Sequence, residues 1–291
     1  MSDVPSIARY VGSKVDLLGA RPDLFPMPAH GGGVAVPFLG GGSVAAFYAA
    51  RGHRVIASDI NARLVNAHVR VRDDAETTIC TLGYIAGTLR DDEKRGGLDG
   101  ARTFFESMRG KLDDGDATLR AARFLFILRA GFNGLYRENE AGECTTAYGK
   151  PKPTKDLVQA DRLRAYSAAI QGVEFLCEDF AITCARALPG WAAYLDSPYE
   201  GTYTGYAGGD WSANQASLPG MGRKSERERL AAMLVYLDGI GARFSNSDSD
   251  SSTTRRLYER WRFESVSRSG QVNSNGEDRG TVNEGLWRNW Q

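Results

Sequence analysis

Histidine and cysteine are scarce in this chain. Its 291 residues include three histidines, His30, His53 and His68, and four cysteines without C-x-x-C spacing or neighbouring histidines. A histidine-based zinc site or catalytic dyad therefore has little material, and we expect no bound metal. A chain of this length does not need covalent cross-links, so we expect free thiols at Cys80, Cys144, Cys177 and Cys184.

Long apolar runs and an excess of charge are also missing. No segment approaches the roughly 18 apolar residues of a membrane span, and the N-terminus lacks a basic end followed by an apolar stretch. We therefore expect a soluble, intracellular protein with no membrane partner. Because 36 Lys and Arg residues balance 36 Asp and Glu residues, any nucleic-acid binding must depend on local basic patches.

A glycine-rich turn lies within the segment VAVPFLGGGSVAAFYAARGHRVIASD, residues 34–59. Its pattern predicts strands over 34–38 and 53–58 and a helix over 43–51. Gly40, Gly42 and Ala45 fit the dinucleotide fingerprint, and Asp59 ends the second strand, where a carboxylate can hold two ribose hydroxyls. The pattern predicts an adenosine-containing ligand and leaves NAD and S-adenosylmethionine open. A tight turn without a ligand is the structural alternative.

A second polar motif follows the apolar run at 192–195, where the sequence reads Asp196, Ser197, Pro198 and Tyr199. A carboxylate and an adjacent main-chain carbonyl can accept hydrogen bonds from a planar exocyclic amine, and an aromatic ring can stack on the base. The alternative is an ordinary turn, because Asp, Ser and Pro are common turn residues.

After the glycine-rich segment, the pattern of apolar and polar residues divides the rest of the chain into three parts. Residues 71–165 have charged helical stretches with few strand signals, which is typical of an inserted helical subdomain. Strands are expected again over 173–177, 192–195 and 241–245, with a helix over 226–238. Near the C-terminus, 262–266 and 281–287 are expected to pair as an antiparallel hairpin across an Asn-Gly turn signal.

Several motifs taken together resemble one family. RYVGSK, PFLGGGS, SDIN, FNGLYREN, EDF and DSPY occur in the order and spacing of Dam-type (D12 class, alpha order) DNA adenine-N6 methyltransferases. The resemblance continues through SNSDSDSSTTRRLYERW, RSGQVNSNG and VNEGL, so it covers nearly the whole chain. It implies a cytoplasmic, bacterial or phage-encoded, site-specific enzyme that acts on double-stranded DNA and needs no obligatory protein partner.

The resemblance also implies a fold and a domain division. The expected fold is the α/β fold of S-adenosylmethionine-dependent methyltransferases, whose mostly parallel seven-stranded sheet contains one antiparallel hairpin. Residues 1–72 and 166–291 would form the catalytic domain. Residues 73–165 would form a helical target recognition domain that carries a DNA-contacting hairpin.

The family's cofactor positions are carried over residue by residue. Tyr10 and Lys14 match the methionine end of S-adenosylmethionine, whereas Asp59 and Ile60 match the ribose and adenine contacts. The full set of implied cofactor residues is Tyr10, Lys14, Phe38, Gly40, Gly41, Gly42, Asp59, Ile60, Asp179, Phe180 and Asp196.

The implied catalytic residues are Asp196, Ser197, Pro198 and Tyr199. The family has Asp-Pro-Pro-Tyr at this place, which binds a flipped adenine and activates its N6, so Ser197 departs from the pattern. A serine still supplies a backbone carbonyl, but the ring that fixes φ near about −65° is lost. We expect activity to survive, with a slower step or an altered acceptor as the alternatives.

The implied DNA-contacting residues lie mainly in the insertion. Arginine suits guanine because its guanidinium can donate to O6 and N7 together. The candidates are Arg9, Asn133, Leu135, Arg137, Lys150 and, as a phosphate contact, Arg268.

Three other functions stay open at this point. One is an enzyme of the same fold that methylates cytosine N4 or an RNA base, and another is a sequence-specific DNA-binding protein with weakened catalysis. The third is an NAD-dependent oxidoreductase, which the glycine fingerprint permits and the other motifs do not support. The recognition sequence, the oligomeric state and any pairing with a restriction enzyme are not specified by the sequence.

Overall fold

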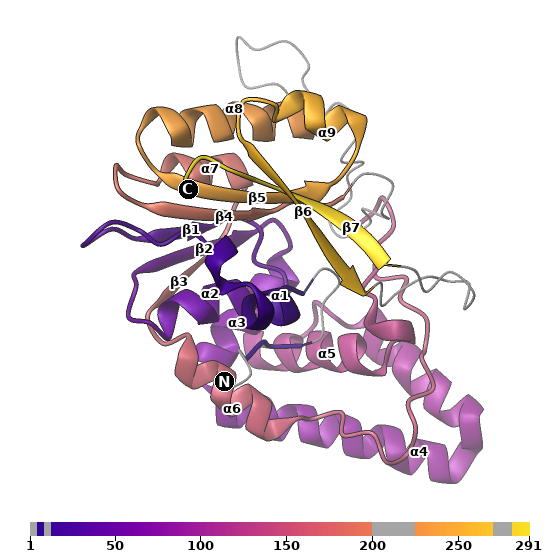
Figure 1. Cartoon of the computed structure of the whole chain (residues 1–291). Coiled ribbons are helices and arrows are strands. Elements are labelled where there is room, and N and C mark those ends of the chain that lie inside the picture. Colours follow the sequence, from indigo (N-terminus) through magenta and orange to yellow (C-terminus); the bar gives the residue numbers. More distant parts are fainter. Residues whose placement is uncertain (1–4, 9–12, 200–224, 270–280) are drawn as a thin grey trace.

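The computed structural model describes residues 5–8, 13–199, 225–269 and 281–291 (Figure 1). Seven strands in these residues form one sheet in the order β3-β2-β1-β4-β5-β7-β6. Their bounds are β1 Val34–Val36, β2 Val55–Asp59, β3 Val173–Cys177, β4 Ala192–Asp196, β5 Arg243–Ser249, β6 Arg262–Ser269 and β7 Thr281–Arg288. β1 to β5 pair in parallel, and β7 is antiparallel to β5 and β6. The expected sheet and its C-terminal hairpin are therefore confirmed.

The central strands are apolar because both faces of the sheet are covered. All three residues of β1 are buried, as are the first four residues of β2 and of β4. β1 ends at Val36, earlier than the predicted 38. The reason is Pro37, which has no N–H to continue a ladder between β2 and β4.

Most helices begin where the sequence supplies a capping side chain. The helix bounds are α1 Val15–Ala20, α2 Ser43–Ala49, α3 Ala62–Asp73, α4 Ala75–Gly110, α5 Ala117–Ala130, α6 Ala160–Ala169, α7 Phe180–Ala185, α8 Glu226–Gly239 and α9 Ser252–Leu257, with short 3-10 turns at Pro22–Leu24 and Phe132–Gly134. Asn61 caps α3, Asp179 caps α7, and Ser225 forms a capping box with Glu228 at α8.

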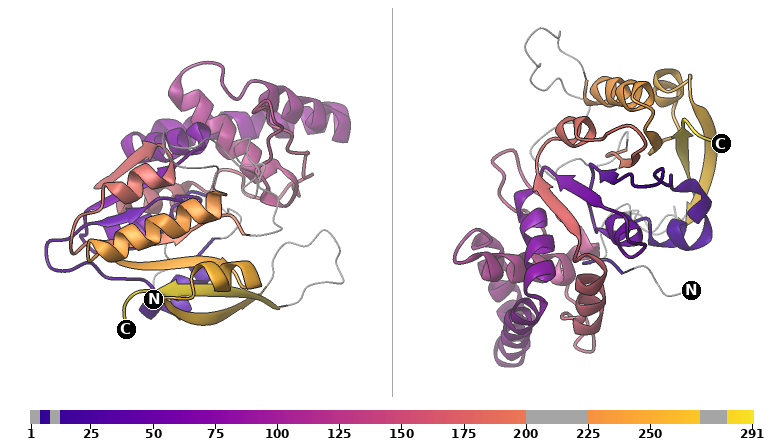
Figure 2. Two further views of the ribbon diagram at one scale, coloured as in Figure 1. Left: turned by 90° about the horizontal axis from the view of Figure 1, so that it is seen from above. Right: turned by 90° about the vertical axis from the view of Figure 1, so that its left-hand side faces the viewer.

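The helices lie in two layers on opposite faces of the sheet. Figures 1 and 2 show α2, α3, α5 and α6 on one side and α7 to α9 on the other, with α4 extending away from the sheet. A cluster of buried apolar side chains runs from β1 through α3 into α4 and α5, where it includes Phe105 and Phe126. A second cluster, including Leu195 and Leu234, fills the space under α7 and α8.

The helices expected over 71–165 are present as α4, α5 and α6. α4 is interrupted at Gly97, whose φ of 61° and ψ of −150° are not helical. After α5 the chain forms an irregular hairpin with isolated antiparallel bridges between Gly131 and Tyr148 and between Glu138 and Cys144. We call residues 131–149 the recognition hairpin. Among the described residues, no helix combines the length and the apolar character needed to cross a membrane.

Candidate functional site

The polar motifs meet at the carboxyl edge of the parallel strands. β2, β1 and β4 are neighbours in the sheet, so the glycine turn after β1 lies between Asp59 at the end of β2 and Asp196 at the end of β4. Asp179 follows β3 on the same edge. Ligands of open α/β sheets bind at this edge. The fold thus brings together motifs that are far apart in the sequence.

Asp59 shapes the glycine turn directly. One carboxylate oxygen accepts the Gly40 N–H at 3.3 Å, and the other accepts the Asn61 N–H at 3.0 Å. Burial raises the pKa of the Asp59 carboxyl above its ordinary value, while these backbone donors act in the opposite direction. Ile60, the next residue, is 60% exposed. A partly buried acid beside an exposed apolar side chain is suited to hold a sugar and the adjoining face of a base.

Gly42 is required by a side chain of the protein itself. Its φ is 77°, and a Cβ at this position would lie 1.9 Å from the Tyr166 hydroxyl. Tyr166 hydrogen bonds to Nδ1 of His68 at 2.7 Å, and Nε2 of His68 contacts the Gly40 carbonyl at 2.9 Å. The imidazole therefore donates from Nε2 to Gly40 and accepts at Nδ1 from Tyr166, which fixes the turn from beneath. The sequence motifs gave no indication of this support.

The stability of the protein is expected to fall in acid through His68. Burial lowers the pKa of His68 to about 4, from an ordinary 6.5. The unfolded state therefore binds more protons between these values, and the stabilisation is complete above the higher one and lost as pH falls towards the lower one. From pH 7 to pH 5 this group should cost about 2 kcal/mol of unfolding free energy.

Urea unfolding of the wild type and His68→Gln at the two pH values tests this expectation. Glutamine can still donate to Gly40 but does not titrate. The stability of the variant should decline less by about 2 kcal/mol, because it lacks the titrating imidazole, while the carboxylates titrate in both proteins and cancel in the comparison. Equal declines would contradict a neutral, buried His68.

Two aromatic rings form one wall of the site. Phe38 and Phe180 stack with their centroids 5.3 Å apart, and Arg229 of α8 lies over the Phe180 ring at 4.9 Å. Asp179 accepts the Ala181 N–H at 2.8 Å and pairs with Arg229 at 2.8 Å. The acid that the resemblance places at the adenine therefore also caps α7 and anchors α8.

Asp196 and Tyr199 lie against a buried lysine. Nζ of Lys14 is 2.8 Å from the Asp196 carboxylate and donates to the Tyr199 hydroxyl at 2.8 Å. The Tyr199 hydroxyl also donates to Asp196 at 3.3 Å. Lys14 is 2% exposed, whereas 21% of the Asp196 side chain is accessible. Asp196, Tyr199 and Lys14 thus form one polar cluster.

Glu284 of β7 completes this cluster and is not among the residues expected from the sequence. Its carboxylate lies 2.9 Å from Nζ of Lys14, and its side chain is 2% exposed. The only available signal was an acid in the expected C-terminal strand, within the motif VNEGL. Its partner is set by the pairing of β7 with β5, which the local sequence pattern does not reveal.

The middle of the motif is held from the opposite face of the sheet. Arg227 of α8 donates to the Pro198 carbonyl at 3.2 Å and pairs with Asp248 at 3.3 Å. Asp248 is fully buried, and burial raises the pKa of its carboxyl although Arg227 acts in the opposite direction. Ser197 is also buried, and its Oγ has no hydrogen-bond partner within the described part of the chain. The serine hydroxyl therefore does not replace the missing proline ring as a local constraint.

Four of the expected DNA-contacting residues lie on or beside the recognition hairpin. Asn133, Arg137 and Lys150 are exposed, and Leu135 is half-buried. Asn133 and Lys150 have φ values of 55° and 49°, so the backbone of both lies in the left-handed region. The backbone of Arg137 is paired across the hairpin, since its carbonyl accepts the Thr145 N–H at 2.8 Å. The structure thus brings these four residues into one region.

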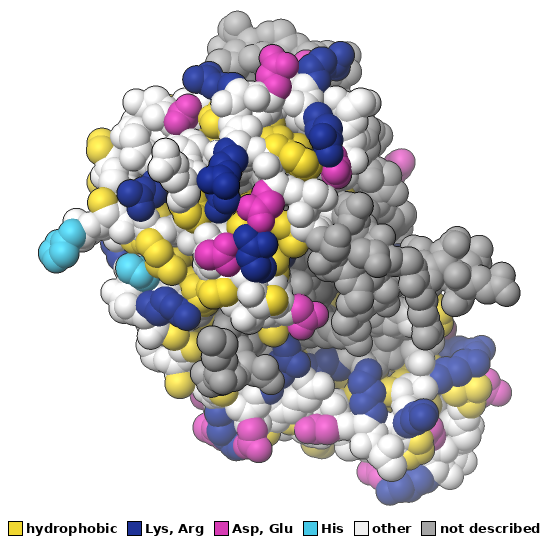
Figure 3. Space-filling view, in the orientation of Figure 1, with side chains coloured by type: hydrophobic (Ala, Val, Ile, Leu, Met, Phe, Trp, Pro, Cys, Tyr) yellow, Lys and Arg dark blue, Asp and Glu magenta, His cyan; other side chains and the backbone are white. Residues whose placement is uncertain are grey.

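The other expected contacts lie at the limits of the described chain. Arg9 and Tyr10 fall outside the described residues. The backbone of Arg268 pairs with Val282 in the C-terminal hairpin, but its side chain is outside the described part. Over the described surface in Figure 3, Lys and Arg side chains are interspersed with Asp and Glu side chains, as the zero net charge suggests.

Comparisons with known proteins identify the family. A family model described as D12 class N6 adenine-specific DNA methyltransferase matches residues 10–273. The chain is 30% identical over 288 residues to a DNA N-6-adenine-methyltransferase of Escherichia phage P1, covering 97% of this chain and 35% of the phage protein. It is 27% identical over 295 residues to a type II methyltransferase of Methanocaldococcus jannaschii, covering 95% and 96%.

A bacterial relative shows the same correspondence. The chain is 29% identical over 259 residues to a DNA adenine methylase of Vibrio cholerae, and this alignment covers 85% of this chain and 83% of the Vibrio protein. The chain therefore spans about a third of the phage relative and most of the other two. With the family model matching residues 10–273 and the expected mostly parallel seven-stranded sheet present, the resemblance is confirmed, and this chain belongs to the D12 class of N6 adenine-specific DNA methyltransferases.

Proposed function

We propose that this chain flips an adenine out of duplex DNA and transfers the methyl group of S-adenosylmethionine directly to N6 at residues 196–199. The observation that carries the proposal is the cluster at the end of β4, where Asp196 and Tyr199 meet Lys14 and Glu284 beside the glycine turn of the neighbouring strand. Family membership supports DNA and the adenine amino group as the substrate.

The proposed cofactor site follows the carboxyl edge of β1, β2 and β3. Asp59 would hold the ribose hydroxyls, and Ile60, Phe38 and Phe180 would enclose the adenine. The partly buried carboxylate, the stacked rings and the glycine turn fit an adenosine group. When bound, S-adenosylmethionine supplies an electrophilic methyl group on a cationic sulfur. The remaining proposed contacts are Tyr10, Lys14, Gly40, Gly41, Gly42, Asp179 and Asp196.

The acceptor site would act by holding and polarising the amino group. The Asp196 carboxylate and the Ser197 main-chain carbonyl accept the two N6 hydrogens, which draws the nitrogen lone pair away from the ring. Tyr199 stacks on the base. N6 would form its new bond to the methyl carbon as the sulfur–carbon bond breaks, and neutral S-adenosylhomocysteine would be the leaving group. N6 would thereby become positively charged, and its proton would pass to Asp196 and then to water.

The charge of the cluster favours this step. With Lys14 at +1 and Asp196 and Glu284 at −1 each, the three side chains sum to a formal −1. Nζ of Lys14 lies 2.8 Å from the Asp196 carboxylate and 2.9 Å from the Glu284 carboxylate. A fixed negative charge at this place stabilises both a cationic donor and the developing charge on N6. Catalysis would therefore depend on positioning and electrostatics, without a covalent nucleophile.

DNA recognition is proposed for residues 73–165, with residues 1–72 and 166–291 as the catalytic domain. Arg137 and Lys150, the exposed cations beside the recognition hairpin, would contact the duplex together with Asn133 and Leu135. A bidentate arginine contact to guanine contributes about 1–3 kcal/mol of discrimination. Arg9 and Arg268 are proposed as further contacts to a base and to a phosphate.

The first test uses purified protein, isotopically labelled S-adenosylmethionine and unmethylated duplex DNA, followed by digestion to nucleosides and mass spectrometry. We expect labelled N6-methyldeoxyadenosine from duplex DNA and no labelled N6-methyladenosine from RNA of the same sequence. Labelled N4-methyldeoxycytidine would instead assign the acceptor to cytosine. DNA and cofactor binding without any methylated nucleoside would show that Ser197 accompanies a silenced site.

A further inference from the structure

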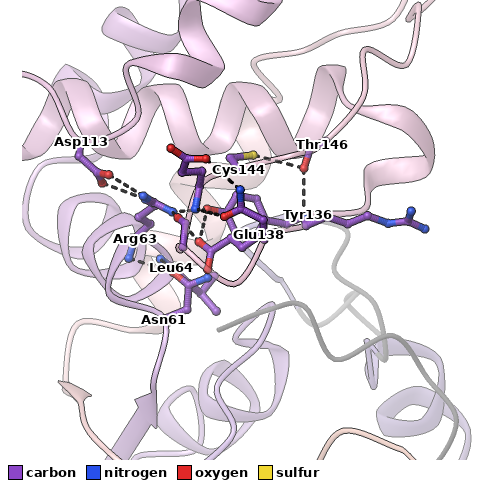
Figure 4. Close-up of polar contacts among 12 residues, drawn as sticks. Asn61, Arg63, Leu64, Asp113, Tyr136, Glu138, Cys144 and Thr146 are labelled. Carbon is purple, nitrogen blue, oxygen red and sulfur yellow. Dashed lines mark hydrogen bonds and ion pairs between the residues drawn. The ribbon is translucent and has the colours of Figure 1, made fainter. Parts of the chain in front are cut away.

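Arg63 connects the cofactor edge of the sheet to the recognition hairpin. It lies in the first turn of α3, directly after the Asp59 strand end and the Asn61 cap. Nη1 donates to the Tyr136 hydroxyl at 2.9 Å, to the Glu138 carboxylate at 2.5 Å and to the Gly142 carbonyl at 2.9 Å. One guanidinium edge therefore holds the first arm of the hairpin and the turn that follows it, as Figure 4 shows for Tyr136 and Glu138.

The other edge of the same guanidinium holds the turn between α4 and α5. Nε donates to one Asp113 oxygen at 2.8 Å and Nη2 donates to the other, so the pair is bidentate (Figure 4). The Arg63 side chain is 21% exposed, whereas Asp113 is 64% exposed. Arg63 lowers the pKa of the Asp113 carboxyl below its ordinary value. A single side chain thus joins α3, the α4–α5 turn and the recognition hairpin.

The hairpin residues that Arg63 contacts alternate with the proposed DNA contacts. Tyr136 is 1% exposed and Glu138 is 8% exposed, and the Tyr136 hydroxyl donates to Glu138 at 2.5 Å. Arg137, between them, is exposed. In an extended segment successive side chains point to opposite sides. Fixing Tyr136 and Glu138 inward therefore sets the direction in which Arg137 points outward.

We infer that Arg63 is a positioning residue for DNA recognition. It keeps the exposed side of the recognition hairpin at a fixed position relative to the cofactor edge of the sheet. The inference rests on the proposed function of the hairpin in DNA binding. Arginine suits this task because its planar fork of N–H donors can serve Asp113 and the hairpin at once. A lysine keeps the charge but cannot bridge both partners, so Arg63→Lys should restore the wild-type behaviour only in part.

The test compares the wild type, Arg63→Gln and Arg63→Lys by steady-state methylation of duplex DNA and by binding of S-adenosylhomocysteine. For Arg63→Gln, KM for DNA is expected to rise roughly ten- to hundredfold, as for a misplaced binding group, with kcat at saturating DNA nearly unchanged. Affinity for S-adenosylhomocysteine should stay within about twofold, because Asp59 and its hydrogen bonds are retained. A merely structural role would lower kcat and the affinities for DNA and S-adenosylhomocysteine together.

Two further variants distinguish a failure of the Arg63 inference from a failure of the proposed DNA contact. Arg70→Gln, on the same helix but paired with Asp73 near the surface, is the matched control and should behave as the wild type. Arg137→Ala tests the DNA contact itself. An unchanged KM for DNA in Arg63→Gln would overturn the inference, and if Arg137→Ala still weakens DNA binding, the proposed function survives that result. An unchanged KM in both variants would overturn the hairpin contact as well.

Discussion

Asp196→Ala is expected to lower the rate of methyl transfer by about a thousandfold, the range typical for loss of a positioned acid–base group. Asp196 is the partly accessible last residue of β4, and its carboxylate lies beside Tyr199. Without it, one N6 hydrogen has no acceptor, and the formal charge of the cluster changes from −1 to zero. Single-turnover methylation of duplex DNA under saturating S-adenosylmethionine measures the rate of the chemical step.

Two variants sharpen this expectation. Asp196→Asn keeps an acceptor oxygen of the same shape and removes the charge, so its rate should fall between those of the wild type and Asp196→Ala. Asp161→Ala, which removes a fully exposed carboxylate of α6, should leave the rate unchanged. Full activity of Asp196→Ala with an intact fold would rule out the proposed acceptor site.

The sequence specified the elements of the catalytic sheet because their signals are local. Alternation of apolar strands with the glycine turn predicted β1, α2 and β2, and the Asn-Gly signal predicted the C-terminal hairpin. Their ends were less well determined, since Pro37 ends β1 early and β2 begins at Val55. Strand ends depend on pairing with neighbours, which a single segment does not contain.

The contacts that support the site could not be read from the sequence. Glu284 reaches Lys14 through the register of the last strands, and Tyr166 reaches the glycine turn through the return of α6 to the sheet. Gly42 was selected as a cofactor residue of the glycine turn, whereas the structure shows a constraint of a different kind, the packing of Tyr166 against it. Arg63 had no motif at all, because each of its partners lies in a distant segment of the insertion.

Lys14→Met is expected to lower the free energy of unfolding, because Lys14 is the buried cation that pairs with two carboxylates. This change removes the cation from between Asp196 and Glu284 while nearly preserving the volume of the side chain. Breaking a buried ion pair by removing one partner costs about 3–5 kcal/mol of unfolding free energy. Glu284→Gln leaves Lys14 paired with Asp196 at 2.8 Å, so it should cost about 1–3 kcal/mol.

The double variant Lys14→Met/Glu284→Gln separates the interaction from the loss of each group. Once the cation is absent, removing the charge of Glu284 relieves repulsion with Asp196, so the double variant should be more stable than Lys14→Met alone. Urea unfolding of the four proteins gives a coupling energy of about 1–3 kcal/mol if the pair interacts as the structure indicates. Additive losses would show that Glu284 and Lys14 act independently. The methylation rate should stay low in the double variant, because Asp196 still lacks the lysine that orients it.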